Sequence, residues 1–164
     1  MPSFKTSREV NHVAENMFAL VADVERYPEF VPLCDDLRIR TRTGEVDGEI
    51  IVADMTVAYK MFRESFTSRV QLKPSRNEIL VHYLDGPFRH LENRWRFTPL
   101  ATEKCRVDFF LSYDFRSRAL QMLMGAVFDR AFRKFADAFE TRANQVYGGR
   151  SAAQSVTPPV LQGI

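Results

Sequence analysis

The sequence has no long apolar run and few cysteines, and both shortages limit where the protein works. Nothing in it approaches the roughly 18 consecutive apolar residues that a membrane-spanning helix needs. Residues 1–10 lack the apolar core of a signal peptide. The 2 cysteines, Cys34 and Cys105, are too few for a disulfide framework in 164 residues. We therefore expect a cytoplasmic protein, with at most peripheral contact with the inner face of the membrane.

Histidine is also scarce, and the charges nearly balance. None of the 3 histidines, His12, His82 and His90, has metal-ligand spacing or lies beside a serine or cysteine in a nucleophile motif. The 23 basic and 21 acidic residues leave a net charge of +2, so composition provides no strong field for nucleic acid. The sequence predicts a protein that is not an enzyme, holds no metal or cofactor and does not bind DNA.

Aromatic residues, in contrast, are abundant. The chain is 45% apolar and has 14 phenylalanines, more than a domain of this size ordinarily contains. Its length suits one hydrophobic unit. Residues 150–164 are polar, contain two consecutive prolines and show no period. We therefore expect a single domain over 1–149, followed by a disordered tail over 150–164.

The order of the hydrophobic patterns indicates an α+β fold. Residues 3–10 alternate as in a strand, and two short helices should follow, the first capped by Asn11 and the second near 25–30. Between 35 and 115, alternating runs separated by turn signals predict one curved antiparallel sheet of six to seven strands in all. Residues 117–147 keep an apolar spacing of 3 and 4, which predicts one long C-terminal helix with Ser117 as N-cap and Gly125 as its weak point.

The stretch 84–97 combines a conformational break with an aromatic strand. Asp-Gly-Pro at 85–87 cannot continue a strand, because glycine tolerates positive φ and proline lacks a backbone donor. After it, alternate residues from Leu91 to Phe97 share one face, and Trp95 is among them. We expect a corner of the sheet at 85–87, with this aromatic face turned toward the long helix.

Three motifs resemble those of the coenzyme-Q-binding START family, which also includes a bacterial ribosome association toxin. Tyr-Pro-Glu-Phe-Val-Pro-Leu-Cys at 27–34 resembles the family signature Tyr-x-x-Phe-x-Pro-x-Cys. The turn and strand at 84–97 and the helix end Ala-Phe-x-x-Arg-Ala at 138–143 look like its other marks. The resemblance covers about residues 3–148. It implies the helix-grip (START / Bet v 1-like) fold, in which the sheet wraps the long C-terminal helix and leaves a tunnel.

The resemblance implies a protein without catalytic activity that binds ubiquinone, or a similar isoprenoid lipid, and supports respiratory electron transfer. Release at a membrane would need a gate, for which 27–34 and the region near Gly125 are the candidates. The other branch implies a different partner, the large ribosomal subunit, whose joining with the small subunit it hinders. A polyketide cyclase or aromatase shares the fold but would need titratable groups in the tunnel.

Inward-facing aromatic and apolar residues are the candidates for ligand contact, because flat rings accept both stacking and alkyl contacts. The same residues could instead fill the core. Glu64 and Asn93 fall on the apolar faces of their strands, so either could bind a ligand oxygen, make an internal hydrogen bond or turn outward at a bulge. The predicted ligand-binding set is Phe30, Met55, Val57, Tyr59, Phe66, Tyr83, Asn93, Trp95, Phe97, Phe109, Leu111, Tyr113, Met124, Phe128, Phe132 and Phe135.

A row of arginines provides the candidate surface for a ribosomal partner. Arg38, Arg40 and Arg42 alternate along one strand. Such a row could neutralise the phosphates of ribosomal RNA or of anionic lipids, or it could be an ordinary solvated face.

Overall fold

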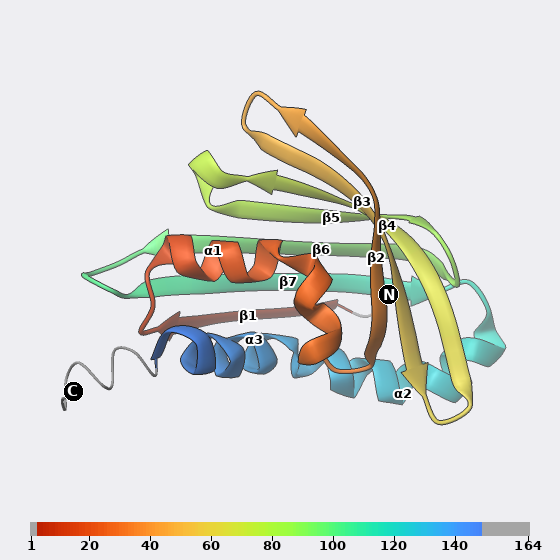
Figure 1. Cartoon of the computed structure of the whole chain (residues 1–164). Coiled ribbons are helices and arrows are strands. Elements are labelled where there is room, and N and C mark those ends of the chain that lie inside the picture. The colour runs from red at the N-terminus through yellow and green to blue at the C-terminus, as the bar shows by residue number, and fades with distance from the viewer. Residues whose placement is uncertain (1–2, 149–164) are drawn as a thin grey trace.

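The computed structural model of the protein describes residues 3–148, which form a curved sheet with helices on its concave side (Figure 1). The predicted tail 150–164 lies outside the described residues, as do residues 1, 2 and 149. The elements in chain order are β1 (Ser3–Val10), α1 (Ala14–Ala22), the 3-10 helix η1 (Val24–Glu29), β2 (Cys34–Glu45), β3 (Gly48–Tyr59), β4 (Phe62–Lys73), the 3-10 turn η2 (Pro74–Arg76), β5 (Glu78–Asp85), β6 (Phe88–Pro99), β7 (Cys105–Phe115), α2 (Arg118–Arg133), α3 (Phe135–Ala143) and the π turn η3 (Asn144–Gly148).

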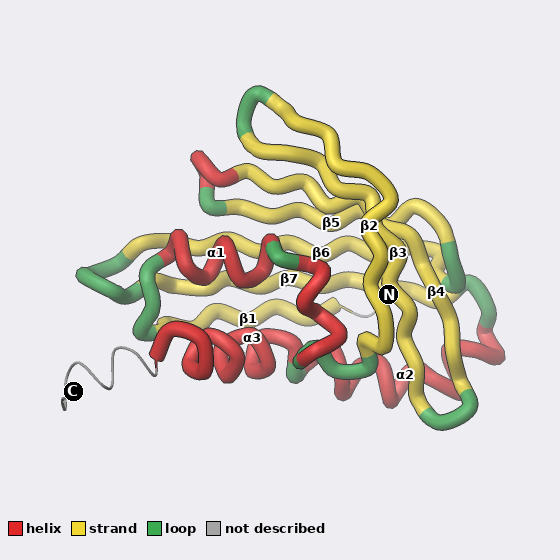
Figure 2. Tube along the Cα trace, in the orientation of Figure 1, coloured by secondary structure: helices red, strands yellow, loops and turns green. Residues whose placement is uncertain are grey.

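The sheet has 7 strands in the order β1-β7-β6-β5-β4-β3-β2, and every neighbouring pair is antiparallel. Strands β2, β3 and β4 turn sharply from the direction of β5, β6 and β7, which gives the sheet its curvature (Figure 2). The predicted α+β helix-grip fold is therefore confirmed, and the two predicted short helices are α1 and η1. The predicted corner at 85–87 is confirmed as well, because β5 ends at Asp85 and β6 begins at Phe88.

The start of α1 differs from the prediction. Its N-cap is Val13, whose carbonyl accepts hydrogen bonds from the N–H groups of Asn16 and Met17, and no side chain caps it. Asn11 precedes the helix in a bend. The next residue, His12, is buried, and its Nε2 lies 2.7 Å from Oδ1 of Asn144, so the chain is tied to the C-terminal helices before α1 begins.

Helices α2 and α3 pack against the concave face of the sheet through aromatic rings. The ring of Phe128 on α2 lies 5.8 Å from that of Phe62 and 6.1 Å from that of Phe88. The ring of Phe139 on α3 lies 4.9 Å from that of Trp95. Offset and edge-to-face pairs of this kind add to the stabilisation from apolar burial.

The predicted single helix over 117–147 is broken, and the break is not at Gly125. Ser117 does cap α2, since its Oγ accepts a hydrogen bond from the N–H of Leu120 at 3.2 Å. Gly125 is buried within α2, whereas α2 ends before Lys134 and α3 begins after it. The N–H of Lys134 bonds to the carbonyl of Ala131, three residues back, at 3.0 Å. A turn tightened in this way brings residues three apart onto one face, which aligns Phe132 with Phe135.

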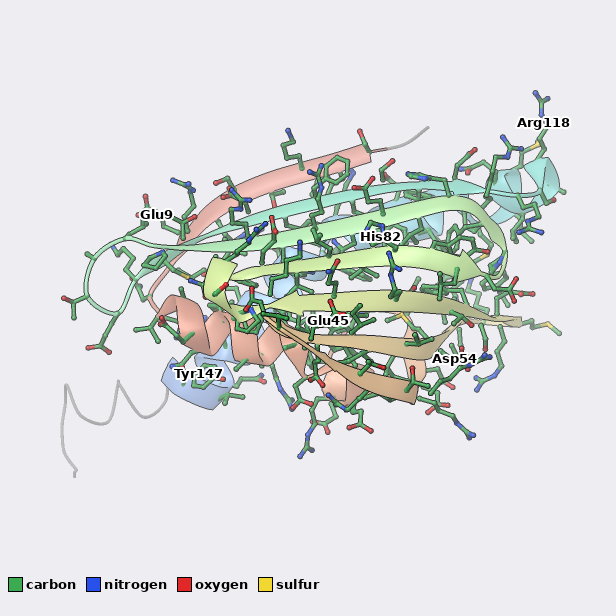
Figure 3. All side chains as sticks on the ribbon, turned by 90° about the horizontal axis from the view of Figure 1, so that it is seen from above. Glu9, Glu45, Asp54, His82, Arg118 and Tyr147 are labelled. Atoms are coloured by element: carbon green, nitrogen blue, oxygen red, sulfur yellow. The ribbon has the colours of Figure 1, made fainter. Side chains whose placement is uncertain are left out.

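The convex face of the sheet is polar. Asp54 and His82 lie on this face, turned away from α2 and α3 (Figure 3). Within residues 3–148, no helix combines the length and the apolar character that crossing a membrane requires.

Candidate ligand-binding cavity

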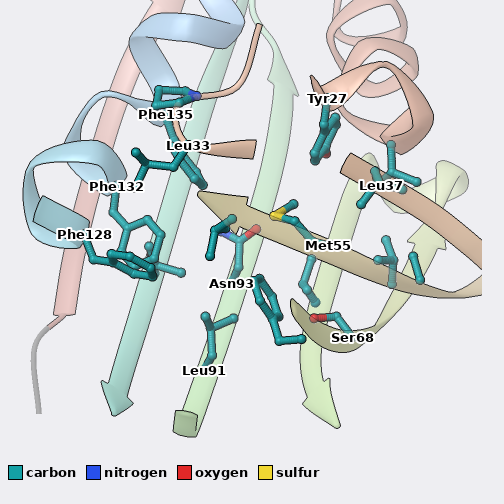
Figure 4. A pocket seen from close by; sticks show the side chains of 18 of the residues that line it. Tyr27, Leu33, Leu37, Met55, Ser68, Leu91, Asn93, Phe128, Phe132 and Phe135 are labelled. Carbon is teal, nitrogen blue, oxygen red and sulfur yellow. The ribbon is translucent and has the colours of Figure 1, made fainter. Parts of the chain in front are cut away.

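A cavity of about 90 Å³ lies between the concave face of the sheet and the helices (Figure 4). Its lining combines residues of η1, the segment that follows η1, strands β2 to β7, α2 and α3. Rings approach it from several elements: Phe66 from β4, Trp95 from β6, and Phe128, Phe132 and Phe135 from the two C-terminal helices. The cavity is therefore a feature of the whole wrapped sheet rather than of one motif.

More than half of the predicted ligand-binding residues meet at this cavity. Those that line it are Met55, Val57, Phe66, Asn93, Trp95, Leu111, Phe128, Phe132 and Phe135. They come from β3, β4, β6, β7, α2 and α3, so the strand parity and the helix spacing identified the correct faces.

The other predicted residues do not line the cavity. Four of them fill the buried core elsewhere, namely Phe97, Phe109, Tyr113 and Met124. Phe30 packs against Phe139, with ring centroids 5.0 Å apart, and Tyr59 lies beneath the ammonium group of Lys60. The hydroxyl of Tyr83 accepts a hydrogen bond from the N–H of Phe88 at 3.1 Å, so it supports the β5–β6 turn. The physical reason is that parity fixes the face of a strand but not the position along it.

Several lining residues were missed from the sequence. They are Val24, Tyr27, Pro32, Leu33, Leu37, Ala53, Ser68, Val70, Val81, Leu91 and Phe139. The sequence did mark some of these residues, because Tyr27, Pro32 and Leu33 belong to the motif at 27–34. Ser68 has the same parity in β4 as Phe66 and Val70, which places it on the inward face.

The two polar residues predicted to face inward behave differently. The side-chain amide of Asn93 lies in the cavity, where its Nδ2 donates to the carbonyl of Phe110 at 2.8 Å and its Oδ1 accepts from Nε1 of Trp95 at 3.0 Å. Glu64 has the parity of the inward-facing residues of β4, but its side chain is exposed, so it does not bind a ligand oxygen in the cavity. It lies near the β3–β4 turn, where a long side chain can reach water from an inward-facing position.

Titratable groups that would support catalysis are scarce around the cavity. The lining contains no Asp, Glu, Lys, Arg or His from the described part of the chain. The hydroxyl of Tyr27 donates to the carbonyl of Val21 at 2.5 Å, and burial raises the pKa of Tyr27. Burial also raises the pKa of the Cys34 thiol to about 12 and that of Cys105 to about 11, so both thiols stay protonated near neutral pH.

No cluster of three or more His, Cys, Asp or Glu side chains that could hold a metal ion occurs in residues 3–148.

The end of η1 and the segment that follows it cover one side of the cavity and are latched to α3. Leu33 lines the cavity and has a φ of 67°, a left-handed conformation that costs a leucine free energy. Glu29 accepts a hydrogen bond from Arg26 at 3.0 Å and forms an ion pair with Arg142 of α3. The guanidinium of Arg142 also lies 5.0 Å from the ring of Phe30. Side-chain contacts with Arg142 therefore hold the motif at 27–34 against α3, although its backbone is strained at Leu33.

The three arginines on β2 are exposed, but the prediction that they form one row is wrong, and they are locally neutralised. A register shift between Ile39 and Thr41 pairs Arg42 with the buried Ile51, so Arg42 lies on the opposite face of the strand from Arg38. Each arginine has a carboxylate partner on the same or a neighbouring segment: Arg38 with Asp36 at 3.1 Å, Arg40 with Asp54 at 2.7 Å and Arg42 with Glu49 at 2.9 Å. The pairing leaves these side chains little unbalanced charge for a phosphate backbone.

The fold and the cavity together define a helix-grip protein of the START / Bet v 1-like class. Residues 10–140 match the sequence profile of the family described as polyketide cyclase / dehydrase and lipid transport. The chain belongs to this family.

Named relatives include both branches expected from the sequence. Ribosome association toxin RatA of Escherichia coli (strain K12) is 36% identical over 151 residues, which are 92% of each chain. Coenzyme Q-binding protein COQ10 homolog B, mitochondrial, of Xenopus laevis is 29% identical over 149 residues, which are 88% of this chain and 59% of that protein. The solution structure of the 18 kDa protein CC1736 from Caulobacter crescentus, 32% identical, superposes with a TM-score of 0.72 and covers 90% of this chain and 99% of its own.

Proposed function

We propose that this protein binds an isoprenoid quinone, ubiquinone or a close relative, in the cavity and supports respiratory electron transfer without chemistry of its own. The observation that carries the proposal is the lining: aromatic rings and aliphatic groups surround the space, and polar side-chain atoms are few. Apolar sites with a few placed polar groups are typical of small-molecule binding. The similarity to a coenzyme Q-binding protein supports the same ligand class.

Binding a quinone ring requires the cavity to widen. An apolar cavity of about 150 Å³ holds one benzene ring, and the cavity here measures about 90 Å³. Leu33 and Phe135 are the residues best placed to move, because one lies on strained backbone and the other follows the break at Lys134. The predicted gate at 27–34 remains part of the proposal, and the second gate candidate moves from Gly125 to Lys134.

Three exposed apolar side chains, one on the β3–β4 turn and two on α2, suit contact with a membrane from which the ligand would be taken. Met61, Met122 and Leu123 are 99%, 87% and 72% exposed. The turn that carries Met61 lies against α2, because Phe62 packs on Phe128, which lines the cavity. Exposed basic residues are close to these apolar side chains in the sequence, Lys60 beside Met61 and Arg118 in the first turn of α2. Apolar side chains among basic ones are the composition of surfaces that bind the interface of anionic membranes.

The direct test is to extract the protein, purified from quinone-containing cells, with organic solvent and to analyse the lipid by mass spectrometry. The proposal predicts a quinone in the extract at a substantial fraction of one per chain. A protein that carries no quinone at any stoichiometry would count against it.

Ribosome association is the second candidate, and one observation favours it: RatA of Escherichia coli has the higher identity and matches nearly the whole chain. The paired arginines of β2 argue against that strand as the contact surface. A cyclase or aromatase is disfavoured, because the cavity lining lacks carboxylates and imidazoles among the described residues, so general acid–base catalysis has no evident group.

A further inference from the structure

Ser68 holds a buried hydroxyl group with an unmet hydrogen bond. The residue is 7% exposed and lines the cavity from β4, between Phe66 and Val70. Its Oγ has no hydrogen-bond partner among residues 3–148. Leaving a buried hydroxyl unpaired costs free energy, because water would have satisfied it in the unfolded chain.

The other polar side-chain groups at the cavity are already engaged. Tyr27 donates to the carbonyl of Val21, and the indole N–H of Trp95 donates to Asn93, whose own amide donates to Phe110. Asn93 was the polar residue of the predicted ligand-binding set, but its hydrogen bonds are made within the protein. Ser68 is the lining residue whose hydrogen-bonding capacity is wholly unused.

The surroundings of Ser68 leave room for a ligand atom. Its partner across β3 is Ala53, a small residue that also lines the cavity. Its partner across β5 is Tyr83, whose hydroxyl is bound to the N–H of Phe88. A water molecule would be held poorly at this place, because buried waters typically need two to four polar partners. A ligand that brings one oxygen on an otherwise apolar ring meets the need with a single bond.

We propose that the Ser68 hydroxyl is the specificity-determining group of the cavity, donating a hydrogen bond to a carbonyl oxygen on the ring of the bound ligand. The cavity then distinguishes oxygen-bearing rings from hydrocarbons of the same shape. This inference rests on the proposed quinone binding and deepens it. The position of Ser68 on the cavity side of β4 and its lack of a partner are the observations that carry it (Figure 4).

The test compares two probes that differ in their ring oxygens: duroquinone, the tetramethyl para-benzoquinone, and durene, the benzene with the same four methyl groups. Duroquinone binding is followed by quenching of Trp95, the single tryptophan, and durene binding by its displacement of duroquinone. In Ser68→Ala, the ratio of the two dissociation constants should shift toward durene by about tenfold, the effect of one net hydrogen bond. Ser68→Thr, which keeps the hydroxyl, should retain the wild-type ratio.

A second readout needs no ligand. Removing an unpaired buried hydroxyl relieves its cost, so the ligand-free Ser68→Ala variant should unfold at a higher temperature than the wild-type protein. Ser112 is the matched control, because it is also 7% exposed but belongs to β7 outside the cavity lining. In Ser112→Ala, the ratio of the dissociation constants should stay within about twofold of the wild-type ratio. The melting temperature should not rise.

The outcomes separate the two proposals. If the wild-type protein binds duroquinone and Ser68→Ala keeps the same ratio, the role of Ser68 is overturned and quinone binding stands. A lowered melting temperature in ligand-free Ser68→Ala also overturns it, because the hydroxyl then has a partner in the protein. If the wild-type protein binds neither probe, the quinone proposal fails and the role of Ser68 fails with it.

Discussion

Gly86 and Phe66 touch where the sheet turns its corner beside the cavity. A Cβ atom on Gly86 would lie 2.6 Å from the Cβ of Phe66, and Gly86 has a φ of 141°. Phe66 lines the cavity, and its ring lies 5.4 Å from that of Phe88, the first residue of β6. The turn that the sequence marks as a conformational break therefore sets the position of a cavity wall.

Replacing Gly86 with alanine should destabilise the protein by about 2 kcal/mol or more. A residue with a side chain is strained at this positive φ, and the new Cβ would collide with Phe66. Chemical denaturation of the wild-type and variant proteins measures the difference. Gly44→Ala serves as the control, since nothing lies within 4 Å of a Cβ at that position. Equal stability of Gly86→Ala and wild type would show that the turn tolerates a side chain.

Filling the cavity from Ala53 should stabilise the protein and weaken ligand binding. Ala53→Val adds two carbons to the buried lining, and cavity-filling changes commonly add about 0.5–2 kcal/mol of stability. Quinone affinity should fall at least about tenfold, because ring and valine compete for the same space. Val52→Ile in the same strand adds a carbon on the other face and should leave affinity unchanged. Unchanged quinone affinity in Ala53→Val would place the ligand elsewhere.

The latch at Glu29 should control how fast the cavity opens. Hydrogen bonds from Arg26 and then Arg142 lower the pKa of Glu29. A carboxylate whose pKa is lowered on folding stabilises the folded protein fully at pH values above its pKa in the unfolded chain, about 4.3. This stabilisation is lost as the pH falls through the lower pKa of the folded state. The substitution Glu29→Gln should therefore release the segment 27–33 at neutral pH. Lowering the pH should release the same segment in the wild-type protein.

Hydrogen exchange of the backbone amides in 27–33, corrected for the intrinsic pH dependence, measures this release. Asp129→Asn is the control, because it breaks an exposed ion pair with Arg133 within α2. Exchange in Glu29→Gln as slow as in the control variant would contradict a latch role for Glu29.

Charge reversal on β2 should separate the two candidate functions. In a variant with Arg38→Glu, Arg40→Glu and Arg42→Glu, quinone affinity should stay within about twofold, because none of these side chains lines the cavity and surface ion pairs contribute little to stability. Co-sedimentation with ribosomes, if the wild type shows it through these arginines, should be lost. The control Arg106→Glu lies on the exposed part of β7. Loss of quinone binding in the triple variant, without unfolding, would contradict the assignment of the cavity.

The faces of the strands followed from the sequence, but the place of each residue along the curved sheet did not. Trp95 and Phe97 share one face of β6, yet Trp95 lines the cavity and Phe97 packs with Phe18 of α1, at 6.2 Å between ring centroids. Alternation has a period of two and contains no information on where the helices leave a gap. Only the packing of α1, α2 and α3 decides which inward residues become lining.

The break in the C-terminal helix was hidden for a similar reason. Lys134 has good helix propensity, so nothing local marks it as a terminus. Gly125, the residue that local propensity singles out, lies in an unbroken and buried part of α2. The break follows from tertiary packing, with Phe132 and Phe135 side by side at a ring distance of 5.2 Å and both at the cavity.

Binding of a quinone ring in the cavity can be measured by titrating the delipidated protein with a short-tailed ubiquinone and following the fluorescence of Trp95. Trp95 lines the cavity and is the single tryptophan of the chain, so a quinone bound there should quench nearly all of the signal. Quinone binding in the cavity predicts saturable quenching at one quinone per chain, with an affinity at least about tenfold weaker in Ala53→Val. Quenching that rises linearly to the solubility limit, and is the same in Ala53→Val, would contradict it.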